Sequence, residues 1–206
     1  MLRDAGSERL LSLALTDFAS PLCKRGEFAR ARDALREALA RSARRGDEMG
    51  YVHALHVLGE VELQAGNPAE AEARLSESLE RARKQGAVRD QCYILHGLAE
   101  AALLQGDEDT AAAHYRASLA IAIELGDERA AVACVTGLAL VAARRGDSTT
   151  SGRLAQAVAQ ADEIDPTAFG GQYERHEDEL ERLRGHAGDG PPLEWEDAVA
   201  LALTVA

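Results

Sequence analysis

Large apolar residues recur every 40 positions along the chain, and a small residue follows each of them. The large residues at one such position are Phe18, Leu58, Leu98 and Leu138. The small residues directly after them are Ala19, Gly59, Ala99 and Ala139. A second series lies between these, with Ala31, Ala71 and Ala111 followed one turn later by Leu35, Leu75 and Tyr115. Large residues beside small ones let packed helices interdigitate, so we expect these positions to be buried between stacked helices.

Glycines divide the chain into equal intervals. They lie at positions 26, 46, 66, 86, 106, 126 and 146, and Asp or Asn follows five of them. Glycine suits the left-handed residue that ends a helix, and Asp or Asn suits the cap of the next one. The spacing therefore predicts one helix per interval and four helical hairpins, at about 7–46, 47–86, 87–126 and 127–165. In the turn after Gly66 we expect Asn67 to cap the helix that Pro68 begins.

The hairpins resemble the tetratricopeptide repeat (TPR). Leu58-Gly59, Ala71 and Leu75 match that repeat best, since its first helix carries a large residue before Gly or Ala and its second carries Ala before an aromatic residue or Leu. The ordinary repeat has 34 residues, and six more add nearly one turn to each helix. The resemblance covers about residues 7–163. It implies an all-α, right-handed solenoid of four hairpins, with residues 1–165 as the repeat array.

Residues 166–206 do not follow the period. Asp165-Pro166 and Gly170-Gly171 interrupt it. Residues 172–184 predict a charged helix with His176 in solvent, residues 185–192 a linker, and residues 194–205 a final amphipathic helix. A solenoid exposes apolar surface at its last repeat unless something covers it, so this two-helix tail is interpreted as a cap. The alternative is that Trp195, Val199 and Leu203 dock onto another subunit and form a homodimer.

A second resemblance concerns the C-terminal half. Residues 125–129, 137–139 and 145–147, together with the closing segment 193–203, resemble the helical tail of large bacterial ATP-binding transcriptional regulators of the LuxR-like class. Such tails bind inducers or partner proteins and relay the event to an ATPase and a DNA-binding domain. The sequence has no P-loop and no helix-turn-helix motif. The resemblance therefore implies a sensor-like module rather than a complete regulator.

Charge and composition exclude several classes of function. Lys and Arg total 23 and Asp and Glu total 35, which gives a net charge of −12. This balance argues against binding to duplex nucleic acid, because such proteins need a basic face. No apolar stretch reaches the roughly 20 residues that a bilayer requires. The three cysteines form no C-x-x-C pair, so we expect them to fill the core of a cytoplasmic protein.

The chemistry-bearing residues gather on the first helix of each hairpin, on the face that should line the concave surface. They are His53, His56, Glu60, Tyr93, His96, Glu100, Thr136 and Arg144. His56 and Glu60 are spaced i, i+4, and the same pair recurs one repeat later as His96 and Glu100. Neighbouring helices lie about 8–10 Å apart, so the side chains of both pairs would have to point toward each other to bind one metal ion. We therefore expect no metal and no other cofactor. Alternatively, the pairs are surface contacts copied by duplication, each worth a few tenths of a kcal/mol.

No enzyme signature is present, so we do not expect catalysis. The sequence favours a recognition module that holds a peptide or protein partner on the concave face, and the acidic charge favours basic partners. Two alternatives remain open. One is a sensor of a small-molecule inducer, or an unconventional enzyme, that uses the groove as a pocket. The other is a structural homodimerisation module.

Overall fold

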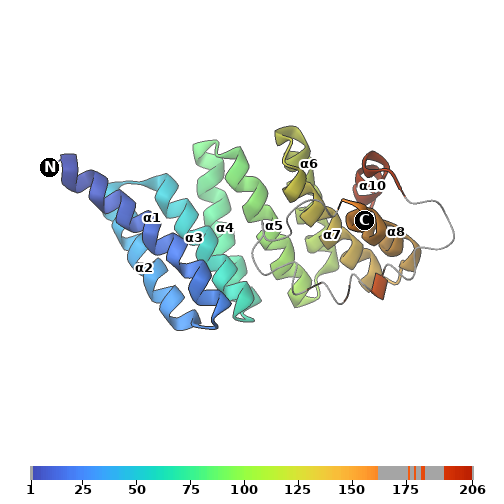
Figure 1. The fold of residues 1–206 in the computed structure, drawn as a ribbon, viewed down its shortest axis with the longest axis horizontal. Helices are drawn as coiled ribbons and strands as arrows, with labels where there is room; N and C mark the ends of the chain where they lie inside the picture. Colours follow the sequence, from blue (N-terminus) through green and yellow to red (C-terminus); the bar gives the residue numbers. More distant parts are fainter. Residues whose placement is uncertain (1, 162–175, 177–178, 180–181, 184–192, 206) are drawn as a thin grey trace. The chain divides into compact units, whose positions relative to one another are not determined.

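The computed structural model describes residues 2–161, 176, 179, 182–183 and 193–205, and Figure 1 shows their fold. Regular structure in these residues is entirely α-helical, as predicted. The chain divides into two compact units, Met1–Ala101 and Ala102–Ala206. The proposed boundary between repeat array and cap, at residues 165 and 166, lies outside the described residues.

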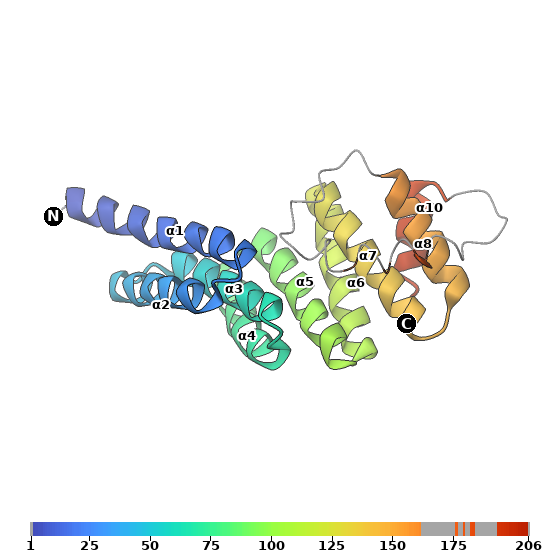
Figure 2. The ribbon, with the colours of Figure 1, turned by 60° about the horizontal axis from the view of Figure 1, so that its bottom comes forward.

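Unit 1 contains two complete hairpins and the first part of a third. Its helices are α1 (Leu2–Lys24), α2 (Phe28–Arg45), α3 (Glu48–Gln64), α4 (Pro68–Gln85) and most of α5 (Val88–Gln105). Helix α1 packs against α2, and α3 packs against α4. Helix α3 also contacts both α1 and α2, so each hairpin stacks on the previous one (Figure 2).

Unit 2 continues the same pattern and ends in the tail. It contains α6 (Glu108–Leu125), α7 (Glu128–Arg144), α8 (Ser148–Gln160) and α10 (Trp195–Ala202). Helix α7 packs against both α6 and α8, and α10 packs against α7 and α8. Ala198 and Ala202 are buried, whereas Leu203 remains exposed. Helix α10 therefore contacts the last hairpin, which is what a cap requires.

All seven glycine turns are built in the same way. Each glycine has a positive φ, between 62° and 81°, which only a residue without a side chain adopts readily. The N–H group after each glycine then bonds the carbonyl five residues back, as from Asp47 to Ser42 at 2.9 Å. This is the Schellman motif. The prediction of a turn at each periodic glycine is confirmed.

The aspartates after these glycines cap the next helices, but Asn67 does not. Asp47, Asp107, Asp127 and Asp147 each accept a hydrogen bond from the N–H three residues on, at 3.0–3.1 Å. The side-chain amide of Asn67 instead donates to Oε2 of Glu62, at 2.9 Å, and makes no cap bond. The prediction for Asn67 is wrong because a buried carboxylate lies within its reach.

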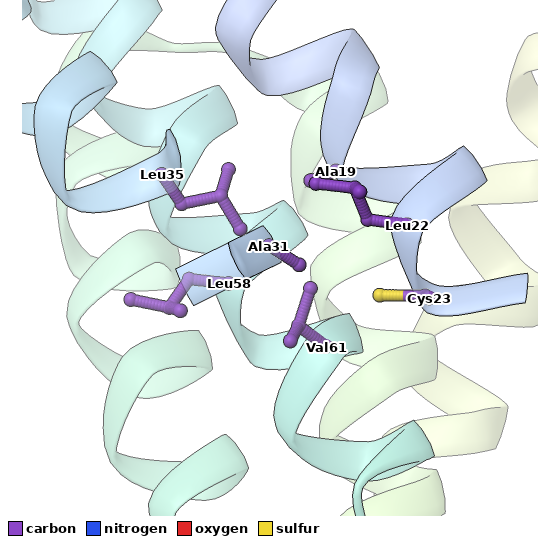
Figure 3. Close-up of a cluster of buried hydrophobic side chains, with 7 residues drawn as sticks. All are labelled: Ala19, Leu22, Cys23, Ala31, Leu35, Leu58 and Val61. Atoms are coloured by element: carbon purple, nitrogen blue, oxygen red, sulfur yellow. The ribbon is translucent and has the colours of Figure 1, made fainter. Parts of the chain in front are cut away.

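The core of the first stacked pair draws on three helices. Ala19, Leu22 and Cys23 of α1 meet Ala31 and Leu35 of α2, and Leu58 and Val61 of α3 (Figure 3). Burial raises the pKa of the Cys23 thiol to about 11, so it is a neutral apolar group. The three cysteines form no disulfide and are all buried, which confirms that they fill the core.

The first repeat departs from the predicted burial at Phe18. Leu58 is 7% exposed, and Leu98 and Leu138 are also buried, but Phe18 is 49% exposed. Leu58 is covered by α1 and α2 of the preceding hairpin. Helix α1 has no such hairpin before it in the described part of the chain. The expectation that Phe18 is buried is therefore wrong.

One buried ion pair joins α2 to α3. The guanidinium of Arg32 donates to both carboxylate oxygens of Glu62, each at 2.7 Å. Glu62 is buried, and the hydrogen bond from Arg32 holds its pKa below the ordinary value, with Asn67 adding to the effect. This pair was not predicted from the sequence.

The tail is described only in part. Residues 176, 179, 182 and 183 are helical, and the rest of the predicted charged helix and the linker 185–192 lie outside the described residues. His176 is buried, so the expectation that it is in solvent is wrong. Among the residues that the structure describes, no helix combines the length and apolar character needed to cross a bilayer.

Candidate functional site

The polar surface of unit 1 forms where α3 and α5 meet. The two helices approach at Gly97, where an added methyl group would lie 3.0 Å from Oε1 of Glu60. Glu60 therefore occupies space that a side chain on α5 would otherwise fill. The same methyl group would lie 3.1 Å from Leu75 of α4, so the Leu75 side chain packs against Gly97 as well. The duplicated His/Glu pairs on α3 and α5 thus belong to one cluster.

His56 is the central imidazole of this cluster. Burial, together with the smaller effects of the charges of His53 and His96, lowers its pKa from 6.5 to about 4. His56 is therefore neutral at pH 7. Its Nε2 lies 3.8 Å from Oε1 of Glu60, which is too far for a direct hydrogen bond. The arrangement is a neutral imidazole beside a carboxylate, and each side chain is 20% exposed.

The second pair lies deeper than the sequence predicts. His96 is 3% exposed, and Glu100 is buried as well. The expectation that the whole face is open to a ligand is wrong for these two residues, and also for Thr136. His53 and Tyr93 are half-buried, like His56 and Glu60. The accessible part of the cluster consists of His53, His56, Glu60 and Tyr93, with His96 and Glu100 behind it.

The two remaining candidates, Thr136 and Arg144, belong to α7 of unit 2. Thr136 is buried, and its hydroxyl group has no hydrogen-bond partner among the residues that the structure describes. Nη1 of Arg144 donates to the carbonyl oxygen of Leu103 at 2.5 Å, so this side chain ties α7 to the end of α5. Arg144 therefore has a structural contact within unit 2.

Metal binding has no support in the part of the chain that the structure describes. No three His, Cys, Asp or Glu side chains there are grouped so that they could hold an ion. His56 and His96 influence each other electrostatically, but neither His/Glu pair forms part of a metal-binding set among these residues. The cluster can instead donate and accept hydrogen bonds and offer the Tyr93 ring to an apolar group.

Comparison with known proteins supports the repeat assignment for the first two hairpins. The sequence model of the tetratricopeptide repeat family matches residues 10–84. The chain thus carries a TPR-like domain. No curated protein matches the chain. TPR domains generally mediate interactions between proteins, and the matched region includes α3, which supplies His53, His56 and Glu60.

A second polar surface of unit 1 was not predicted. Arg81 of α4 lies over the ring of Tyr51, 4.4 Å from its centre, and pairs with Glu48 and Glu77 at 3.0 and 3.1 Å. With Glu80, Lys84 and Gln85, these charged residues line a depression of about 330 Å³. Lys84 pairs with Glu80 at 2.6 Å, so both cations are matched by carboxylates of the depression itself. The i, i+4 spacing was the sequence signal for the Glu77–Arg81 and Glu80–Lys84 pairs, but not for the pair between Glu48 and Arg81.

Proposed function

We propose that this protein is a non-catalytic recognition module that binds an extended or helical protein segment along α3 and α5 of unit 1. The observation that carries the proposal is the accessible His53–His56–Glu60–Tyr93 surface on the first helices of two TPR-like hairpins. TPR domains generally bind protein partners, which makes a peptide the fitting ligand.

The cluster suits a peptide with basic side chains. Neutral His56 can both donate and accept a hydrogen bond, which matches the alternating groups of a peptide backbone. Glu60 offers a carboxylate to Lys or Arg, and Tyr93 offers a ring to an apolar or cationic side chain. The net charge of −12 would speed the encounter with a basic segment. His96 and Glu100 would then position the outer groups rather than touch the ligand.

Selection from a displayed library of random short peptides tests the proposal, followed by calorimetry on the enriched peptides. We expect enrichment in Lys and Arg, and at least tenfold weaker binding to His56→Ala and Tyr93→Ala. His114→Ala is the matched control, because His114 is a half-buried histidine on α6 of unit 2 and is not one of the cluster residues. Enriched peptides that bind all three variants as well as the natural chain would refute the site.

The finer role as a regulator tail rests on a resemblance to the helical tail of LuxR-like ATP-binding regulators, carried by residues 125–129, 137–139, 145–147 and 193–203. In that role the bound segment comes from a regulatory protein, or a small-molecule inducer takes its place. A thermal-shift screen of small metabolites separates the two ligands. A compound that raises the Tm of the natural chain but not of the Tyr93→Ala variant would favour the inducer. The location in the cytoplasm stays a prediction.

A further inference from the structure

Helix α1 carries apolar residues on two opposite faces. The inner face packs against α2 and α3 and contains Ala19, Leu22 and Cys23, all buried. Oγ of Ser12 bonds the carbonyl oxygen of Ala38 at 3.1 Å and Oγ of Ser42 at 3.0 Å, which fixes the rotation of the helix. A surface helix needs one apolar face, so a second one calls for a partner.

The outer face of α1 is an exposed apolar strip made of Leu10, Leu11, Ala14 and Phe18. Leu10 is 68% exposed, and Leu11 and Phe18 are also exposed. At about 100° per residue these four residues span an arc of about 100° on the helix surface. The other exposed large apolar residues of the described chain are spread over α3, α5, α6 and the end of α10. Within the described residues, only α1 gathers three of them on one face.

The repeat itself shows that this strip is a packing surface. Phe18 corresponds to Leu58, and Leu58 is covered by Ala19, Ala31 and Leu35 of the preceding hairpin. Figure 2 shows α2 and α3 on the inner side of α1, and no described helix of unit 1 on its other side. The strip therefore continues the stacking interface between hairpins, and no helix among the described residues of unit 1 covers it.

The strip is complementary to itself. Leu10 and Phe18 lie four residues before and after Ala14, so an antiparallel pair of α1 helices that crosses at Ala14 would place each Leu10 against the partner's Phe18. The small alanine lets the two helices approach closely at the crossing point. The opposite end of the array does not offer this contact. Ser151 and Ala155, which correspond to Ala31 and Leu35, are buried, and α10 packs on their helix.

From these observations we propose that two copies of this chain associate through their α1 helices, in a two-fold symmetric, antiparallel contact centred on Ala14. This surface is distinct from the peptide-binding surface on α3 and α5 and does not depend on it. The contact is small and apolar, so the dimer should have a dissociation constant in the micromolar range. Two copies that each carry a charge of −12 repel, and added salt should strengthen the association.

Sedimentation velocity at concentrations from the low micromolar range to hundreds of micromolar tests the association. We expect the mass to rise from the 22.0 kDa of one chain to twice that value. Phe18→Glu should keep the chain monomeric over the whole range, while circular dichroism shows that its helices remain. Ile123→Glu is the matched control, since Ile123 is 48% exposed on α6. This variant should dimerise like the natural chain. A natural chain that keeps the mass of a monomer overturns the proposal, as does a dimer that survives Phe18→Glu.

Two further variants test the geometry. Ala14→Cys should form an intermolecular disulfide under mild oxidation, whereas Ser20→Cys, on another side of the same helix, should not. The natural cysteines are buried and do not compete. Equal cross-linking of both variants overturns the antiparallel arrangement. Leu203→Glu separates this dimer from one built through α10: loss of the dimer in that variant would overturn α1 as the interface.

Discussion

The ring of Tyr115 on α6 lies directly on Gly137 of α7. A methyl group at Gly137 would come within 2.2 Å of the Cζ atom of Tyr115, which no real contact allows. The same relationship occurs one repeat earlier between Leu75 and Gly97, where the distance is 3.1 Å. In both pairs a large residue of the second helix of a hairpin packs on a glycine of the next helix. The contact of Tyr115 with Gly137 is the closer one and leaves less room for a side chain.

Gly137→Ala should lower the free energy of unfolding by about 2–3 kcal/mol, because the buried Tyr115 ring has no room to move. Gly97→Ala should change it by less than about 1 kcal/mol, since the gain in helix propensity offsets the displacement of flexible neighbours. Urea denaturation of both variants checks the difference. Tyr115→Leu in the Gly137→Ala background should restore part of the loss. Equal costs for the two glycines would contradict this account of the packing.

Glu62→Gln should destabilise the protein by about 3 kcal/mol, because the substitution removes the charge that matches the part-buried guanidinium of Arg32, and an unmatched charge in that position is costly. Glu70→Gln provides the control, because Glu70 pairs with Arg74 at an exposed position and should contribute less than about 0.5 kcal/mol. Urea denaturation again measures both free energies of unfolding. Similar decreases in the free energy of unfolding for the two variants would show that the buried ion pair contributes no more to stability than the exposed one.

The stability of the protein should fall as the pH drops from about 6.5 to about 4, in part because of His56. Its pKa is about 4 in the folded chain and ordinarily 6.5, so the unfolded chain binds more protons in this window. The contribution is at most about 3 kcal/mol. His56→Gln should flatten this part of the pH dependence in calorimetry at several pH values. Parallel pH curves for the natural chain and His56→Gln would exclude His56 as the cause.

Asp147→Ala should cost about 1 kcal/mol, because the side chain of Asp147 caps α8. The hydroxyl and the N–H of Thr150 both hold the pKa of Asp147 below its ordinary value, which indicates a bonded carboxylate in the folded chain. Asp109→Ala is the matched control, since Asp109 forms an exposed ion pair with Arg145. Thermal unfolding should show a clearly larger decrease in Tm for Asp147→Ala than for Asp109→Ala.

The features that the sequence predicted well are those that depend on local chemistry or on repetition. A glycine followed by Asp closes a turn with groups only a few residues apart, so Gly126-Asp127 is recognisable without knowing the rest of the fold. The succession of a large and a small residue, as at Leu58 and Gly59, repeats and is visible as a period. For these reasons the glycine turns and the helices between them could be predicted from the sequence.

The features that the sequence did not predict depend on the residues packed around a position, and these residues differ between equivalent positions of the repeats. Arg32 and Glu62 have no counterparts one repeat later, where Glu72 and Ala102 stand, so no periodicity indicated them. His56 and His96 occupy equivalent positions, yet His96 is the more deeply buried. Phe18 differs from Leu58 because of what precedes its helix. Periodicity assigns a residue to a face but does not tell what lies against that face.

The uniform glycine turns also bear on how such a chain can change its length. Each turn is closed by bonds within a stretch of a few residues, and none depends on a distant hairpin. Excision of residues 67–106 would join Gly66 to Asp107 and leave a complete turn at the junction. Genes of this kind can therefore lose or duplicate one unit by recombination between copies without the product losing a working connection.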